Sequence, residues 1–134
     1  MSFVFDSSSI FYAIKENKVE HLVANHTVEL TRYELSNVIW KDLVLHKRIR
    51  SKESNELIDL VKSVLGTMNV LKIDSHEKSI LDVAAMLTIT FYDACYVFYA
   101  KEIEATLVTE DSSLTKRLGK YVTALRMGNI LSPK

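Results

Sequence analysis

The chain has 134 residues, of which 48% are hydrophobic and 25% are charged, and its 17 basic and 17 acidic side chains leave a formal net charge of zero. This length and composition are typical of one folded domain, so we expect residues 1–134 to form a single domain. Zero net charge argues against a protein that wraps nucleic acid by bulk positive charge. The one dense basic cluster comprises Lys47, Arg48, Arg50 and Lys52.

The sequence also limits the compartment and any membrane association. Cys95 is the only cysteine, so an internal disulfide is excluded and a reducing compartment is expected. The first residues, MSFVFDSSS, lack the basic lead and long apolar core of a signal peptide. Charges interrupt every apolar run before it reaches the ~20 residues of a membrane span. We therefore expect a cytoplasmic protein that does not enter a membrane.

Short apolar strands alternate with longer amphipathic helices along the chain. The first strand, residues 2–5, stops at DSSS, and a helix begins near Ser9. Later strands are expected at residues 27–30, 70–73, 106–109 and 121–125. The longer helices are expected at residues 31–46, 54–65, 75–87 and 91–103, with a short one at 112–118. This alternation predicts a three-layer α/β/α domain with a mostly parallel central sheet of about five short strands.

The two helices after the second strand have the clearest helical spacing of apolar residues. The first carries Leu35, Val38, Ile39, Leu43 and Val44, and the second carries Leu57, Ile58, Val61 and Leu65. Gly66 is expected to end the second helix, as glycine commonly does. Trp40 belongs either to the core or to an interface, because tryptophan is enriched in both.

Four acids fall where a strand delivers the chain to a helix, or in a first helical turn. Asp6 follows the first strand, and Asp111 follows the strand ATLVT. Glu34 is expected in the first turn of the helix after TVEL, and Asp93 in the first turn of the 91–103 helix. In an open parallel sheet, sites are built outside the carboxyl ends of the strands. The pattern therefore predicts that these carboxylates converge at one edge of the sheet.

Taken singly, each acid is better explained as a helix cap. Thr31 and Glu34 match the capping-box spacing, and Thr90 with Asp93 is a variant of it. Asp6 and Asp111 are plausible N-caps. Taken together, the acids need a further explanation. Two unit charges ~5 Å apart repel by roughly 3 kcal/mol at an effective dielectric constant near 20, whereas a charge at a helix start contributes only ~0.3–1 kcal/mol.

Either some of these acids are protonated or a cation neutralises them. Oxygen ligands alone suit Mg²⁺ or Mn²⁺. The histidines show no HExxH-type spacing, and one cysteine does not build a zinc site. If a cation neutralises them, carboxylate oxygens are therefore its expected ligands and Mg²⁺ or Mn²⁺ the expected ion.

Three stretches carry a resemblance to a known family: FVFDSSSIFYAI, TRYELSNVIWK and FYDACYVFYAKEIEATLVTEDSSL. In this order they resemble PIN-domain nucleases, particularly VapC-type toxins of toxin–antitoxin pairs. The likeness runs from Phe3 to about Leu125, and its most specific part places Asp93 and Asp111 eighteen positions apart.

The resemblance implies a PIN-like fold and Mg²⁺- or Mn²⁺-dependent RNA cleavage by Asp6, Glu34, Asp93 and Asp111. It further implies that the hydroxyl residues Ser7, Ser8 and Thr109 support these acids. Glu110 is an extra acid beside Asp111, so the sequence leaves open which of the two side chains points inward. The resemblance also implies a small antitoxin partner and a homodimer, and an apolar stripe of Trp40, Leu43, Val44 and Ile49 favours the dimer as well.

Other functions remain open at this point. The domain could be a non-catalytic interaction module whose acids are all caps, or a PIN nuclease that processes RNA outside a toxin–antitoxin pair. A receiver-type phosphoryl-transfer domain is disfavoured because DSSS offers a single acid in the early loop. Among the tyrosines, Tyr96 and Tyr99 are expected in the core, whereas Tyr33 and Tyr92 directly precede acids and could stack on unpaired bases.

Overall fold

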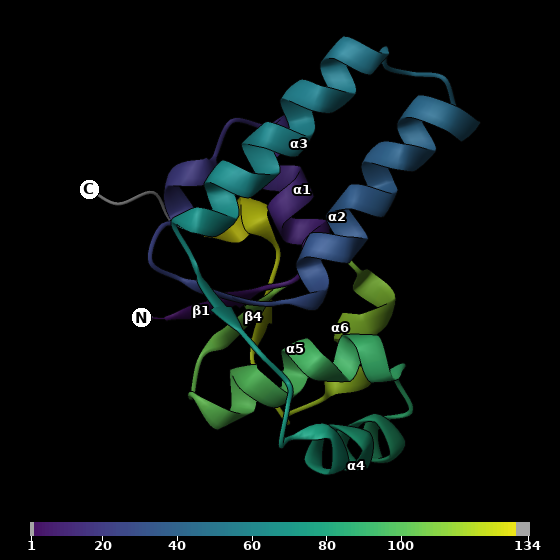
Figure 1. Ribbon diagram of the computed structural model, residues 1–134. Helices are drawn as coiled ribbons and strands as arrows, with labels where there is room; N and C mark the ends of the chain where they lie inside the picture. Colours follow the sequence, from purple (N-terminus) through teal and green to yellow (C-terminus); the bar gives the residue numbers. More distant parts are fainter. Residues whose placement is uncertain (1, 131–134) are drawn as a thin grey trace.

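The computed structural model describes residues 2–130, and its centre is a five-stranded sheet (Figure 1). The strands are β1 (Phe3–Phe5), β2 (His26–Val28), β3 (Asn69–Leu71), β4 (Thr106–Val108) and β5 (Ala124–Leu125). Their order across the sheet is β3-β2-β1-β4-β5, and every pair is parallel. The first three strands therefore extend the sheet from β1 through β2 to β3. The last two extend it from β1 in the opposite direction, first β4 and then β5.

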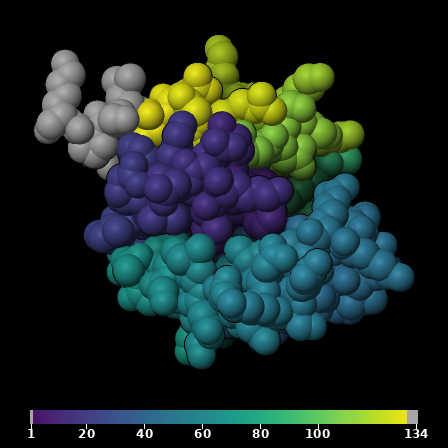
Figure 2. Space-filling view, turned by 90° about the horizontal axis from the view of Figure 1, so that it is seen from above, coloured from purple at the N-terminus to yellow at the C-terminus, as the bar shows by residue number. Residues whose placement is uncertain are grey.

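Two layers of helices cover the sheet, which confirms the three-layer α/β/α prediction. The helices are α1 (Ser7–Lys15), α2 (Leu30–Trp40), α3 (Ser51–Gly66), α4 (Glu77–Leu87), α5 (Phe91–Glu102) and α6 (Ser112–Leu118). In Figure 1, α1, α2 and α3 lie on one side of the sheet, and α4, α5 and α6 on the other. Figure 2 shows the N-terminal part of the chain between the α2–α3 hairpin and the C-terminal part.

Alternation along the central strands divides the core between these layers. Val4 and Leu107 pack in the cluster with α4, α5 and α6. Phe5 and Val108, the next residues in each strand, pack in the cluster with α1, α2 and α3. Because successive side chains of a strand point to opposite faces, strands of three residues are long enough to serve both cores.

The second strand and the helix after it are shifted from the predicted boundaries. The strand ends at Val28, and α2 begins at Leu30, because Glu29 already has helical backbone angles (φ −54°, ψ −27°). The expected strand at residues 27–30 is therefore too late by two residues at its end. Glu34 consequently lies in the second turn of α2 and not in the first.

The long helix predicted at residues 31–46 changes type before it ends. After Trp40 it widens into a π-helix, Lys41–Leu45, where the His46 N–H donates to the Lys41 carbonyl at 2.9 Å. The π-helix and α3 form the outer end of a hairpin that projects beyond the sheet (Figure 1). Short 3₁₀ helices at Val19–His21 and Met127–Asn129 complete the helical segments of residues 2–130.

The prediction that α3 ends at Gly66 is confirmed, but Gly66 is not the C-terminal cap. Gly66 is the last residue of the helix, and the cap is Thr67, whose φ of −93° is an ordinary right-handed value. The Thr67 hydroxyl donates to the Val64 carbonyl at 2.7 Å, so a side chain satisfies a terminal acceptor that a glycine cap would leave to the backbone.

Within residues 2–130, no single helix is long and apolar enough to cross a membrane. Only α4 and α5 taken together pass a test of length and composition, and they meet at a bend of 104°.

Candidate active site

The sheet order places the first and fourth strands side by side, and each delivers a predicted acid to the same edge. Phe5 pairs with Val108, the Asp6 N–H donates to the Val108 carbonyl at 3.1 Å, and the first residue after β4 is Thr109. The two halves of the sheet, β3-β2-β1 and β4-β5, meet between β1 and β4, and the direction in which strands are added reverses there. In an open α/β sheet, the crevice outside the carboxyl ends of strands at such a switch point is the usual ligand site.

Asp6 is buried at this edge, where it begins α1. Its Oδ1 accepts hydrogen bonds from the Ser9 N–H at 2.9 Å and the Ser8 hydroxyl at 2.7 Å. The predicted N-cap role is therefore confirmed. Burial raises the pKa of Asp6 above its ordinary value, against the opposing effect of hydrogen bonds from Thr109, Ser8 and Ser9. The fold thus holds a carboxylate in a place where its negative charge is costly.

Hydroxyl groups join the loops that follow β1 and β4. Ser8 Oγ lies 3.4 Å from Thr109 Oγ1 and accepts from the Glu110 N–H at 3.0 Å. Thr109 Oγ1 accepts from the Asp111 N–H at 3.1 Å. Ser8 and Thr109 therefore connect the segments that carry Asp6 and Asp111. Within residues 2–130 the Ser7 side chain makes no hydrogen bond, so only two of the three predicted hydroxyls have these contacts.

Asp111 and Glu110 point to different partners. Asp111 is exposed and caps α6, with its Oδ1 accepting from the Leu114 N–H at 3.1 Å. Glu110 Oε1 accepts from the Met127 N–H at 3.2 Å, and its Oε2 lies 3.5 Å from Arg126 Nε. Glu110 is therefore engaged with the segment after β5. This explains how two adjacent acids in one loop can have different roles.

Asp93 lies in the first turn of α5, and α5 is on the opposite side of the sheet from α1, the helix that Asp6 caps. Thr90 is the N-cap and accepts from the Asp93 N–H at 3.0 Å, as the capping pattern predicts. Burial raises the pKa of Asp93, and the negative charges of Asp111, Asp6 and Glu34 raise it further. The other three acids therefore lie close enough to Asp93 for their charges to act on it.

Glu34 has a partner that the sequence analysis did not identify. The predicted capping box with Thr31 is wrong, because α2 has Glu29 as its N-cap and the Thr31 side chain caps nothing. Glu34 Oε1 instead accepts a 2.6 Å hydrogen bond from the Tyr96 hydroxyl of α5. This contact links two helices whose residues are 62 positions apart, so a local pattern does not contain it.

The donor chemistry of these residues fits a hard divalent cation. None of the ion pairs within residues 2–130 involves Asp6, Glu34, Asp93 or Asp111. Burial raises the pKa of the nearby Cys95 to about 11, which keeps the thiol protonated and leaves carboxylate oxygens as the available ligands. In the described part of the chain, no three His, Cys, Asp or Glu side chains are arranged to hold one ion together as they stand.

A parallel sheet of this order with helices on both faces defines an α/β domain of the PIN type, and comparisons with known proteins agree. No family model matches the chain. It is 29% identical to ribonuclease VapC3 of Pyrobaculum aerophilum over 134 residues, covering 92% of this chain and 99% of that protein. It is 30% identical to exonuclease VapC9 of the same organism over 116 residues, covering 85% of this chain and 84% of that protein.

Solved structures show the same fold. The crystal structure of PAE2754 from Pyrobaculum aerophilum matches with a TM-score of 0.78 and 27% identity, over 96% of this chain and 92% of that one. VapBC2 from Rickettsia felis, solved with a DNA fragment from its promoter, matches with a TM-score of 0.65 and 17% identity, over 94% and 98% of the two chains. The chain belongs to the VapC family of PIN-domain proteins.

Proposed function

We propose that this protein is a Mg²⁺- or Mn²⁺-dependent endoribonuclease and the toxin of a toxin–antitoxin pair, with Asp6, Glu34, Asp93 and Asp111 as its catalytic and metal-binding residues. The observation that carries the proposal is the geometry of the sheet edge, where Asp6 follows β1 and Asp111 lies just beyond the neighbouring strand β4. The charges of Asp111, Asp6 and Glu34 also act on Asp93 and, after burial, raise its pKa. The similarity to relatives named ribonuclease and exonuclease supports RNA as the substrate.

The four acids would divide the chemistry of phosphodiester hydrolysis. Asp6 and Asp93 would hold the first ion, and Glu34 and Asp111 would complete the ligand set or accept the proton of the attacking water. A bound divalent ion supplies Lewis-acid chemistry that activates water and offsets the charge of the phosphate. Asp6 is buried, Glu34 and Asp93 are half-buried and Asp111 is exposed, so rotation of the Asp111 side chain could bring it towards an ion beside Asp6.

Helix capping does not compete with this role. Asp6 and Asp111 each use Oδ1 to accept from a backbone N–H, and a carboxylate has a second oxygen. The alternative function, a module whose acids are only caps, accounts for these two residues. It does not account for Glu34, which caps no helix, or for the charges of the other three acids that act on Asp93.

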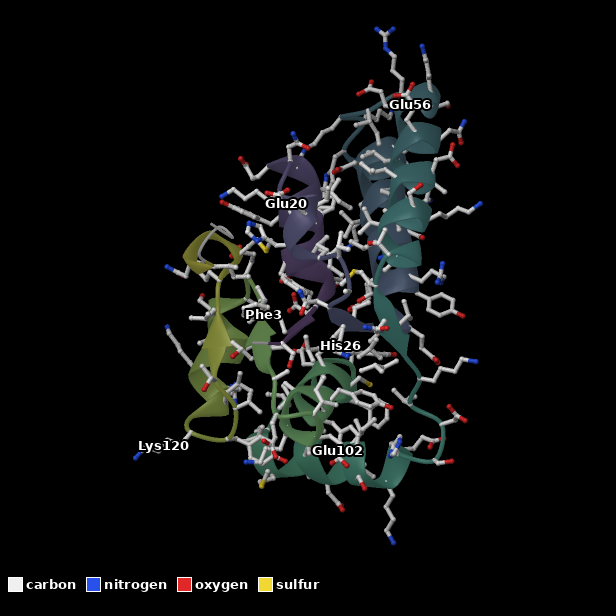
Figure 3. All side chains as sticks on the ribbon, turned by 90° about the vertical axis from the view of Figure 1, so that its left-hand side faces the viewer. Phe3, Glu20, His26, Glu56, Glu102 and Lys120 are labelled. Atoms are coloured by element: carbon white, nitrogen blue, oxygen red, sulfur yellow. The ribbon has the colours of Figure 1, made fainter. Side chains whose placement is uncertain are left out.

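The proposed activity predicts cleavage of single-stranded RNA that stops when a chelator removes the divalent ion. We expect purified protein to cut a mixed RNA pool in Mn²⁺. A circular RNA would distinguish internal cleavage from cleavage at chain ends, because an endonuclease opens the circle and an exonuclease does not. The Glu56→Gln variant, at the end of α3 away from the sheet (Figure 3), should keep full activity and serves as the control. An intact RNA pool in Mn²⁺, with no inhibitor bound, would count against the proposal.

The basic cluster is an unsuitable place for the scissile phosphate. Arg48 and Arg50 lie in the connection between the π-helix and α3, at the end of the hairpin away from the sheet (Figure 1). Arg48 is also paired with Asp42 at 3.7 Å. Contacts from this cluster would therefore reach RNA only at a distance from the acids.

We further propose a homodimer and a small antitoxin protein that covers the acidic edge when activity must be silent. The supporting observation for the dimer is an exposed apolar strip that runs from the last residue of α2 into the π-helix. Trp40, Val44 and Leu45 are 47%, 45% and 58% exposed. Of the other residues predicted for this strip, Leu43 is half-buried and Ile49 packs against the core. An exposed strip of this kind commonly marks an interface.

The dimer proposal predicts that light scattering at micromolar concentration gives twice the mass of the chain. Introducing charge into the strip with Val44→Glu and Leu45→Glu should shift the protein to a monomer, because a buried unpaired carboxylate strongly opposes association. Leu81→Glu, an equally exposed position on α4, is the matched control and should remain dimeric. A monomer mass for the wild-type protein would refute the dimer.

A further inference from the structure

A network of hydrogen-bonded side chains runs from Glu34 into the core and ends on the backbone of β1. The Tyr96 hydroxyl donates to Glu34 Oε1 at 2.6 Å and lies 2.8 Å from Thr31 Oγ1. Thr31 Oγ1 lies 2.8 Å from Thr27 Oγ1, and the Thr27 hydroxyl donates to the Phe5 carbonyl at 2.7 Å. Four contacts of hydrogen-bond length therefore connect the carboxylate to the residue that precedes Asp6, and the three hydroxyl protons serve three of them at a time.

The hydroxyl side chains of this network are buried as completely as the apolar core around them. Thr27 and Thr31 are fully buried, and Tyr96 is 1% exposed. A buried hydroxyl costs free energy unless it is hydrogen-bonded, and each of these three hydroxyls has two oxygen neighbours within 2.8 Å. The network is therefore a fixed support for the one carboxylate that it contacts.

The position of Tyr96 on its helix connects this support to the other acids. Asp93 and Tyr96 are three residues apart on α5 and so lie on the same face of the helix. A side chain held by Tyr96 is thus held one turn along from Asp93. At its other end the network reaches Phe5, directly before Asp6. One run of hydrogen bonds links the elements that carry Asp6, Glu34 and Asp93.

We propose that Tyr96 is a positioning residue for the divalent-cation site, holding the Glu34 carboxylate beside Asp93 through the hydroxyls of Thr31 and Thr27. The inference rests on the proposed function, because it assigns Glu34 to that site. Tyr96 touches neither ion nor RNA in this arrangement, since it is buried beneath Glu34. Its contribution is to keep one carboxylate oxygen fixed, so that the other is presented without the entropic cost of ordering a free glutamate side chain.

The test of this proposal compares two tyrosines of the same helix. Tyr96→Phe removes the hydroxyl that contacts Glu34, and Tyr99→Phe removes one that donates to the Lys72 carbonyl, away from the acids. Both tyrosines are buried, and Tyr96→Phe loses contacts with Glu34 and Thr31 whereas Tyr99→Phe loses the contact with Lys72. Mn²⁺ affinity is measured by calorimetry, and kcat and KM are measured on one RNA. Removing an outer support of a metal ligand typically lowers affinity or activity by about 10- to 100-fold.

We expect Tyr96→Phe to weaken Mn²⁺ binding and lower kcat within this range while KM for RNA stays unchanged. Tyr99→Phe should match the wild type in all three. A second pair tests the inner part of the network. Thr31→Ser keeps the hydroxyl and should behave as the wild type, whereas Thr31→Val should resemble Tyr96→Phe.

Glu34→Gln separates this inference from the proposed function. If Glu34→Gln loses Mn²⁺ binding and Tyr96→Phe does not, the positioning role of Tyr96 is overturned and the site stands. If wild type and Glu34→Gln bind Mn²⁺ equally, or neither binds it, the proposed site and the role of Tyr96 are overturned together. Equal losses of thermal stability in Tyr96→Phe and Tyr99→Phe, with wild-type Mn²⁺ affinity and kcat in both, would show that the Tyr96 hydrogen bond only stabilises the core.

Discussion

Asp93→Asn should unfold at a higher temperature than the wild type in chelator and should be inactive with Mn²⁺. Burial and the charges of Asp111, Asp6 and Glu34 all raise the pKa of Asp93, so its ionised form is unfavourable in the metal-free protein. Removing that charge relieves repulsion on the order of 1 kcal/mol. The same change removes a proposed ligand, so stability without the ion and activity with it should change in opposite directions.

The gain in stability should depend on pH with a defined sign. A carboxyl with a raised folded-state pKa binds more protons folded than unfolded, so its contribution to stability decreases as pH rises. The decrease begins near the ordinary carboxyl pKa of 3.8 and is complete above the raised folded-state pKa of Asp93. The advantage of Asp93→Asn over the wild type in chelator should therefore be small at low pH and largest near neutrality.

Asp59→Asn is the matched control for this series, because Asp59 is an exposed acid of α3, which lies in the other helical layer. Its melting temperature in chelator should follow that of the wild type at every pH, and its cleavage of RNA should be unchanged. A destabilised but active Asp93→Asn would mean that Asp93 serves only the start of α5.

Asp6→Asn should fold but lose the response to divalent ions. Asparagine is as good an N-cap as aspartate, so the start of α1 should be kept while the charge is removed. An ion that binds only the native state stabilises it by about 2.7 kcal/mol at a hundredfold excess over Kd. We expect this stabilisation in the wild type and little of it in Asp6→Asn, with RNA cleavage reduced roughly a hundredfold or more.

Thermal melts across a Mn²⁺ titration check the Asp6 prediction. Glu56→Gln removes an acid of α3 far from the sheet and should keep the wild-type response (Figure 3). An Asp6→Asn variant that is stabilised by Mn²⁺ as much as the wild type would remove Asp6 from the proposed site.

The sequence determined the features that depend on neighbouring residues. Alternating apolar strands and amphipathic helices predicted the parallel three-layer fold, and α6 was placed at its observed bounds, residues 112–118. The N-caps Asp6 and Asp111 were also predicted, because a cap bonds to a backbone N–H three residues ahead. The edge where the four acids were expected to meet follows from strand order, which α/β folds restrict to a few arrangements.

Tertiary structure decided which partner each polar side chain takes. The Thr31–Glu34 spacing has the form of a capping box, yet Thr31 bonds to Thr27 and Tyr96, and Glu34 bonds to Tyr96. Likewise, only the packing of the segment after β5 shows that Glu110 engages Met127 and Arg126 while Asp111 caps α6. The physical reason is the same in both cases. A local hydrogen bond competes with partners tens of residues away, and the choice between them depends on which groups the packed core leaves within reach.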